Sequence, residues 1–227
     1  MAAYDLEEQE QLAEIKAWWK QNGNLVTGIV VAASVGILAW QGWNWYQNKQ
    51  ATQASSVYGV LQRAVIEKDT QKTKSAAGEL VEKFGGSAYA PLGALTAAKA
   101  LHDAGDLKSA KAQLTWAAEN GTNEIRDVAR LRLAAVLFDE KAYDEALKVL
   151  SANHSSGFDG RFSDLRGDIL AAQGKKSEAA EAYKAVLAKL ADSTKNAKDQ
   201  NSMQARELNA PYREMVQQKL DSLGEVK

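Results

Sequence analysis

The residue types that carry most enzyme chemistry are few and far apart in this chain. Its two histidines, His102 and His154, are separated by 52 residues, so they are not spaced to share one metal ion on a helix. Cysteine is absent, which excludes thiol nucleophiles, thiolate metal sites and disulfides. The Gly-x-Ser-x-Gly, P-loop and dinucleotide-binding glycine patterns are also missing. We therefore predict no catalytic, cofactor-binding or metal-binding residue, and a protein that is not an enzyme.

Asp164 and Asp168 are an acidic pair with a spacing suited to joint chemistry, because residues four apart share one face of a helix. Paired carboxylates can act as general acid and base. Such pairs are more often solvated helix surface, and we interpret this pair in that way. The whole chain has 28 basic and 29 acidic side chains, so its charge gives no reason to expect nucleic-acid binding.

The most informative segment has no charged side chain from residue 21 to residue 48. Its apolar run from Leu25 to Tyr46 makes a helix of roughly 33 Å, which matches the hydrocarbon core of a bilayer. Aromatic side chains that favour the headgroup layer flank the run, and lysines follow them outward. We predict a transmembrane anchor over residues 24–47. The flanking residues are Trp18, Trp19, Trp40, Trp43, Trp45 and Tyr46, with Lys16, Lys20 and Lys49.

Two other interpretations of this segment stay open, a buried helix of a soluble protein and a cleaved signal peptide. Helices of soluble proteins are seldom apolar on all sides. Signal peptides usually begin with basic residues and end with small ones, whereas this tail is acidic and the run ends in bulky side chains. The lysines favour a tail inside the cell and a domain outside by a small margin.

Residues 1–23 form the predicted cytoplasmic tail. Leu12, Ile15 and Trp19 share one face of a possible helix, which predicts either an interfacial helix on the membrane surface or a frayed tail. Asn22-Gly23-Asn24 is a possible break in that helix before the anchor.

The rest of the chain is rich in alanine and repeats with a period near 34. Four alanines are 34, 36 and 33 residues apart, each with a larger residue four positions later and a small one twelve positions earlier. Small residues let antiparallel helices approach closely, and the large residue fills the space beside them. We predict an all-α fold in which a transmembrane helix precedes a tetratricopeptide-like α-solenoid of about four helical hairpins, over residues 48–190. Alanine-rich hairpins without a true repeat are the alternative. The alanines are Ala76, Ala110, Ala146 and Ala179, the large residues Leu80, Leu114, Leu150 and Tyr183, and the small ones Ala64, Ala98, Ala134 and Gly167.

The C-terminal part divides into two predicted segments. Residues 191–210 are polar with almost no apolar face, which predicts a mobile connection or a frayed helix. Residues 211–227 begin with Pro211 and carry an apolar face, which predicts a short helix that caps the last repeat.

The repeats offer a binding surface in place of an active site. In tetratricopeptide pairs the first helix faces a concave groove through its second, fifth, ninth and twelfth positions. In the third pair this register gives an apolar strip, which marks a protein-binding site if it is exposed. The alternative is that another helix of the same chain covers the strip. The candidate partner-binding residues are Tyr58, Leu61, Lys99, His102, Val128, Leu131, Phe138, Arg161 and Asp164, and the same register contains Val65, Lys68, Leu92, Leu95, Ala135, Asp168 and Ala171.

A second candidate surface lies within the anchor. Gly28, Ala32 and Gly36 are spaced by four, so they form a stripe of small residues that allows close approach of another membrane helix. Ordinary transmembrane composition is the alternative, because Gly and Ala are common in such helices.

Taken in order, these segments resemble one family. The chain is similar to the YfgM-like ancillary subunits of the bacterial SecYEG translocon. Four segments carry this similarity: the tail Leu12-Ala-Glu-Ile-Lys-Ala-Trp-Trp-Lys-Gln-Asn-Gly23, the single anchor, the weak repeats with Asp164-Leu-Arg-Gly-Asp168, and the helix from Pro211. The resemblance implies a single-pass protein of the cell inner membrane, with a cytoplasmic N-terminus and a periplasmic repeat domain. It implies the SecYEG translocon, a membrane-anchored periplasmic chaperone of the PpiD type, translocating client proteins and membrane lipid as partners. It implies no catalytic residue.

With this resemblance, we expect a non-enzymatic adaptor at the Sec translocon that is linked to periplasmic chaperone activity and binds or hands over newly translocated proteins. A periplasmic tetratricopeptide scaffold for envelope or outer-membrane assembly is the alternative. An enzyme or its regulatory subunit is a third possibility, disfavoured by the missing catalytic constellations.

Overall fold

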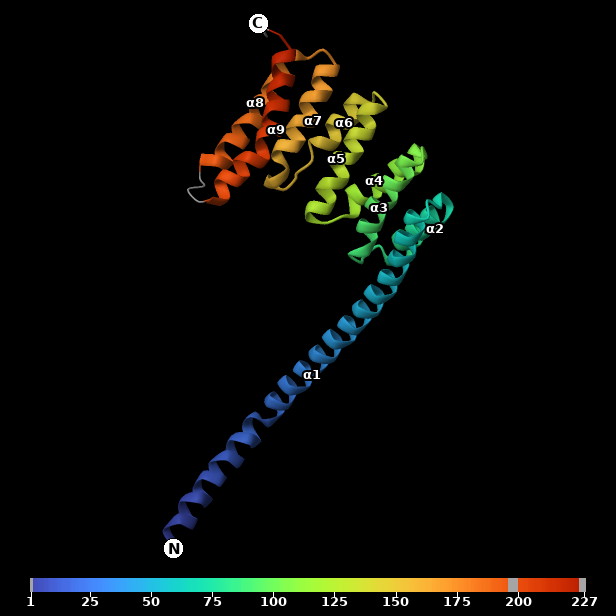
Figure 1. Ribbon diagram of the computed structural model, residues 1–227. Helices are drawn as coiled ribbons and strands as arrows, with labels where there is room; N and C mark the ends of the chain where they lie inside the picture. Colours follow the sequence, from blue (N-terminus) through green and yellow to red (C-terminus); the bar gives the residue numbers. More distant parts are fainter. Residues whose placement is uncertain (1, 196–199, 225–227) are drawn as a thin grey trace. The chain divides into compact units, whose positions relative to one another are not determined.

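The computed structural model describes residues 2–195 and 200–224, and the side chains of residues 10–191 and 209–224 (Figure 1). In these ranges every regular element is a helix, which confirms the all-α prediction. The chain divides into two compact units, Met1–Thr52 and Gln53–Lys227.

The first unit consists of one helix, α1, which extends over Ala2–Ile66 and so also supplies the start of the second unit. Within the described residues, α1 is the one helix long and apolar enough to cross a membrane. The aromatic side chains at the C-terminal end of the apolar run contact polar residues that follow them in α1. The Nζ of Lys49 lies 5.3 Å from the centroid of the Trp45 ring, and Gln50 Nε2 donates to the hydroxyl of Tyr46 at 2.8 Å.

Residues 22–24 are helical, so α1 has no break where the sequence offered one. Asn22 donates from its side-chain amide to the carbonyl of Trp18, four residues earlier, which satisfies the polar group within the helix. Gly23 is buried beneath the Trp19 ring, whose Nε1 would lie 3.2 Å from a Cβ at this position. The missing side chain of Gly23 therefore accommodates an aromatic ring here and does not end the helix.

The second unit is a series of antiparallel helical hairpins, as predicted. The end of α1 pairs with α2 (Thr70–Phe84). The second pair consists of α3 (Tyr89–Asp103) and α4 (Leu107–Asn120). The next two pairs are α5 (Asn123–Asp139) with α6 (Tyr143–Leu150) and α7 (Asp159–Ala172) with α8 (Lys176–Lys195). A 3-10 turn, η1 (Ser156–Phe158), precedes α7, and α9 (Gln200–Ser222) packs on α8.

All four hairpins turn in the same way, which the small-residue spacing did not itself predict. Two residues after the first helix of each pair ends, the backbone has a positive φ, at Lys68, Gly105, Lys141 and Gly174. The next backbone N–H then bonds back to a carbonyl five residues earlier, at 2.8 to 2.9 Å in each turn. This is the Schellman geometry that ends helices. The four hairpins therefore share one turn geometry.

The predicted small and large positions interlock in the core. Every one of the four alanines, the four large residues and the four small residues is buried. At Gly167 the fit is close, because a Cβ would lie 2.5 Å from Cε1 of Tyr183. The α7–α8 pair therefore depends on the absence of a side chain at this residue.

The C-terminal segments differ from the prediction. Residues 196–199 of the predicted polar connection lie outside the described residues, but α9 already begins at Gln200 and contains Pro211 within it. Residues with high helix propensity, such as Gln200, Met203 and Glu207, favour this helix. The prediction missed it because it relied on apolar periodicity, which this segment lacks. An internal proline costs about 3 kcal/mol, which the packing of the later part of α9 offsets.

Replacing Gly167 with Ala is expected to lower the free energy of unfolding by about 1–3 kcal/mol, because the added methyl group overlaps the Tyr183 ring. Gly78→Ala is the matched control, since no heavy atom lies within 4 Å of a Cβ there, and it should stabilise α2 by about 0.5–1 kcal/mol. Urea unfolding followed by circular dichroism measures both. Equal effects of the two substitutions would contradict the close contact.

Candidate partner-binding surface

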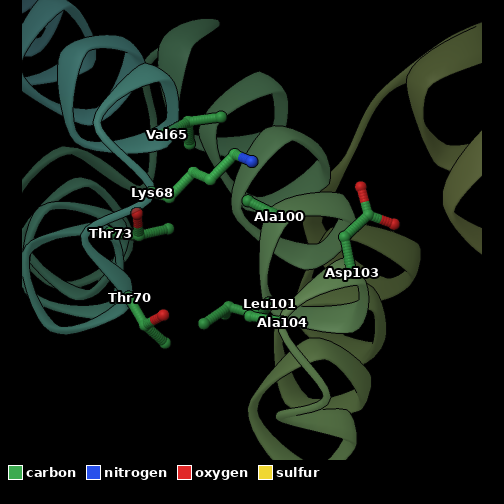
Figure 2. Close-up of a pocket in the computed structure, with 8 residues that line it drawn as sticks. All are labelled: Val65, Lys68, Thr70, Thr73, Ala100, Leu101, Asp103 and Ala104. Atoms are coloured by element: carbon green, nitrogen blue, oxygen red, sulfur yellow. The ribbon is translucent and has the colours of Figure 1, made fainter.

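Three grooves follow the first helices of the hairpins, where the sequence placed the binding surface. The first groove has a volume of about 330 Å³ and lies between the end of α1, α2 and α3. Figure 2 shows Val65, Lys68, Thr70 and Thr73 on one side of it, with residues of α3, including Asp103, on the other. The predicted positions Val65 and Lys68 are therefore in a groove.

The second groove lies between α3 and α5 and has a volume of about 380 Å³. Lys99 and His102, two of the candidate residues, line it together with Arg132 and Asp139. Its floor is apolar and includes Ala135 of the predicted strip. Lys99 is paired within its own helix, because its Nζ lies 2.6 Å from Oδ2 of Asp103.

The third groove is the largest of the three, with a volume of about 840 Å³. Five elements line it, namely α5, η1, α7, α8 and α9. It brings together Leu131, Arg161 and Asp164, three candidate residues from two hairpins. Tyr212 and Asn209 of α9 form part of its wall, so the C-terminal helix helps to build the surface.

The other candidate residues are not in these grooves. Leu61 and Leu95 belong to the core, with 0% and 9% of their surfaces exposed. Leu61 and Leu80 pack against Gly93, where a Cβ would lie 3.3 Å from Leu61 Cδ2 and 2.4 Å from Leu80 Cδ1. Tyr58 is half-buried, with its ring 5.7 Å from that of Tyr89 and its hydroxyl 3.5 Å from Oγ1 of Thr96.

The apolar strip of α5 is partly covered by its own chain. Val128, Leu131 and Phe138 are half-buried and pack against the central core, and the Phe138 ring lies 5.9 Å from that of Tyr143. Only Leu131 of these three lines a groove. The strip is therefore not a continuous exposed patch, in line with the alternative that its own chain covers it.

The acidic pair of α7 fixes α9 and is not free helix surface. The Nζ of Lys219 lies 2.8 Å from Oδ1 of Asp164 and 2.8 Å from Oδ2 of Asp168. The hydroxyl of Tyr183 donates to Oδ1 of Asp168 at 2.8 Å, and that of Tyr212 donates to Oδ2 of Asp164 at 3.3 Å. Three helices thus meet at two carboxylates. The sequence shows the i, i+4 pair but not its partners, which lie 15 to 55 residues away.

The titration of this cluster follows from burial and charge. Burial by itself lowers the pKa of Lys219, but hydrogen bonds to Asp164 and Asp168 outweigh it and hold the pKa above its ordinary value. Burial is the main cause that raises the pKa of the Tyr183 and Tyr212 hydroxyls, and the neighbouring carboxylates raise it further. Both phenols therefore keep their protons and remain hydrogen-bond donors at neutral pH.

A buried carboxylate holds the loop that borders the third groove. Asp127 is fully buried, and its Oδ2 accepts the backbone N–H of Ser155 at 2.9 Å. Burial opposes ionisation of Asp127, but the bonds from Ser155 prevail and lower its pKa. His154 stacks on Phe162 with ring centroids 3.9 Å apart, and its Nε2 lies 3.3 Å from Asp159. Among the described residues, no group of three or more His, Asp or Glu side chains is arranged to hold a metal ion.

The small-residue stripe of the anchor is open in the structure. Ala32 is exposed, and no heavy atom lies within 4 Å of a Cβ built on Gly28 or Gly36. The three residues share one face of α1. Contact of this face with another membrane helix stays a prediction.

Comparison with known proteins assigns the family. Residues 16–225 match the family described as tetratricopeptide repeat-like domain. A protein of Neisseria gonorrhoeae named ancillary SecYEG translocon subunit is 31% identical over 98% of this chain and 100% of its own length. The chain belongs to this ancillary-subunit family. The protein of the same name from Haemophilus influenzae is 31% identical over 80% of this chain and 89% of its own length. A solved structure, the MamA RS-1 ArsTM double mutant, is 21% identical over 75% of this chain and 93% of its own length, with a TM-score of 0.48.

In this member of the ancillary-subunit family, Lys219→Met should loosen α9 while keeping the volume of the side chain. The substitution leaves Asp164 and Asp168 partly buried without their cation, which we expect to cost about 1–2 kcal/mol. Hydrogen exchange should accelerate over residues 209–223, with α3 and α4 unaffected. Arg213→Met, an exposed position on the same helix, is the matched control. Equal exchange in both variants would contradict the role of Lys219.

Proposed function

We propose that this protein is a non-enzymatic, membrane-anchored adaptor at the Sec translocon. The anchor in α1 holds it in the cell inner membrane, with the N-terminus in the cytoplasm and the repeat unit in the periplasm. The repeat unit binds newly translocated segments and passes them to a membrane-anchored periplasmic chaperone of the PpiD type. The observation that carries the proposal is the match to ancillary SecYEG translocon subunits over nearly the whole chain.

The geometry supports an adaptor through weak binding. The grooves lie one after another along a series of hairpins, which suits transient contact with an extended chain. Tethering to one membrane raises the local concentration of a partner to about the millimolar range, so weak contacts suffice. Weak contacts also allow release of a client that has yet to fold.

A scaffold for envelope or outer-membrane assembly is the second candidate. It uses the same repeat unit but does not need a specific anchor sequence. Exchange of residues 25–46 for an unrelated membrane helix distinguishes the two functions, because only the translocon adaptor requires contacts from the face of Gly28, Ala32 and Gly36.

Photocrosslinking in cells tests the adaptor directly. A photoreactive amino acid in place of Gly28 is expected to crosslink to SecYEG, and one in place of Leu131 to the chaperone or to translocating proteins. A crosslinker at Lys184, an exposed residue of α8 outside the three grooves, is the control. The absence of translocon, chaperone and client crosslinks from Gly28 and Leu131 would overturn the proposal.

The orientation is testable with single cysteines, because the chain contains none of its own. We expect Ser177→Cys in α8 to react with a membrane-impermeant maleimide in intact spheroplasts. Glu10→Cys should react only after the membrane is permeabilised. The reverse pattern would place the repeat unit in the cytoplasm and contradict the proposed localisation.

A further inference from the structure

We propose that the second groove, between α3 and α5, binds an extended polypeptide segment in which an apolar side chain is flanked by one basic and one acidic side chain. Asp139 and Arg132 of α5 receive the two charges, and the floor of the groove receives the apolar side chain. This inference rests on the proposed function and deepens it, because it states which translocating segments the repeat unit prefers.

The floor of this groove is apolar. Ala98 of α3, Leu114 of α4 and Val136 of α5 line it and are otherwise buried, and Ala135 of α5 lines it as well. The two alanines have short side chains, and the groove has a volume of about 380 Å³. An apolar side chain of a guest that enters this space leaves water, which favours binding.

A cation and an anion lie on either side of this floor. Arg132 and Asp139 both line the groove and are exposed. They share one face of α5 with Ala135 and Val136, which lie between them along the helix. Their separation of seven residues corresponds to about 10.5 Å along the helix axis. The groove therefore has one charge of each sign at a fixed spacing.

Neither of these charges has an ionic partner in the described part of the chain. The other cation that lines the groove, Lys99, is paired with Asp103 at 2.6 Å. His102 lies beside the same carboxylate and carries no formal charge at pH 8. Lys99 and Arg132 thus balance Asp103 and Asp139. Because the net charge of the groove is zero, the placement of its charges selects a partner.

The backbone strengthens the negative end of the groove. Asp139 is the last residue of α5, and Asp103 is the last residue of α3. The turns after these helices lie on one edge of the array, because Lys111 near the start of α4 is paired with Glu140 after α5. Helix C-termini carry partial negative charge, so this edge attracts a cation. Arg132 lies two turns away and can form two parallel hydrogen bonds to a carboxylate.

An extended segment matches this arrangement. Residues i, i+2 and i+4 of a strand face the same side, and about 13 Å separate the first from the last. The flexible side chains of Arg132 and of a guest lysine cover the difference from the spacing on α5. A Lys-x-Leu-x-Glu segment therefore places Lys at Asp139, Leu on the floor and Glu at Arg132. A segment with two like charges gains one ion pair and meets repulsion at the other end.

Fluorescence anisotropy at pH 8, with the full-length protein in zwitterionic nanodiscs, tests this inference. The mixed peptide is Gly-Ser-Lys-Ser-Leu-Ser-Glu-Ser-Gly, with an uncharged dye at its N-terminus and an amidated C-terminus. The doubly basic and doubly acidic peptides have two Lys or two Glu at the charged positions. We expect the mixed peptide to bind about fivefold more tightly than either, with a preference that declines as salt is added.

Two substitutions of exposed side chains should change the preference. Arg132→Glu makes both ends of the groove negative, so the doubly basic peptide should bind most tightly. Asp139→Lys makes both ends positive, so the doubly acidic peptide should bind most tightly. The protein with both substitutions should again prefer the mixed peptide.

Arg166→Glu and Glu181→Lys are the matched controls, because they make the same charge changes at exposed residues that do not line the groove. Both should leave the preference for the mixed peptide intact. The inference would be overturned by equal binding of the three peptides, by no binding of the mixed peptide, or by control variants that change the preference as much as the groove variants. The crosslinks expected from Gly28 and Leu131 do not depend on these charges, so the two proposals fail separately.

Discussion

The contact between the Tyr183 ring and the bare backbone of Gly167 is the constraint on which the C-terminal half of the repeat unit depends. It sets how closely α8 approaches α7 and places the Tyr183 hydroxyl on Asp168. Asp164 and the second oxygen of Asp168 then receive Lys219 of α9. The position of α9 in turn completes the wall of the largest groove through Tyr212. One missing side chain thus affects a surface built by several helices.

The turns of the four hairpins also depend on a single residue each. Each hairpin uses one left-handed residue and one Schellman bond, so the direction of the next helix is fixed by the backbone. An array of this kind presents its grooves one after another along the series of hairpins. In the proposed adaptor, binding strength would come from several weak contacts, and the place of action from the segment around Gly28, Ala32 and Gly36.

The sequence predicted the parts of the fold that depend on local spacing. Buried residues such as Ala110 and Leu114 were found from their period, because close helix packing requires a small residue at fixed intervals. Leu61 was assigned to the groove by the average repeat register. Leu61 is instead buried against Gly93 of the next hairpin, a contact that no local pattern reveals. The partners of Asp164 were missed for the same reason, since Lys219 is 55 residues away in sequence.

Lysine crosslinking and mass spectrometry on the full-length protein, with SecYEG and a stalled translocation intermediate in nanodiscs, test the proposed function most directly. The proposed function predicts client crosslinks at Lys99 and Lys189, which border the second and third grooves. Lys111 and Lys148 border the pocket between α4, α5 and α6 and serve as internal references. Client crosslinks at Lys111 and Lys148 with none at Lys99 and Lys189 would contradict it.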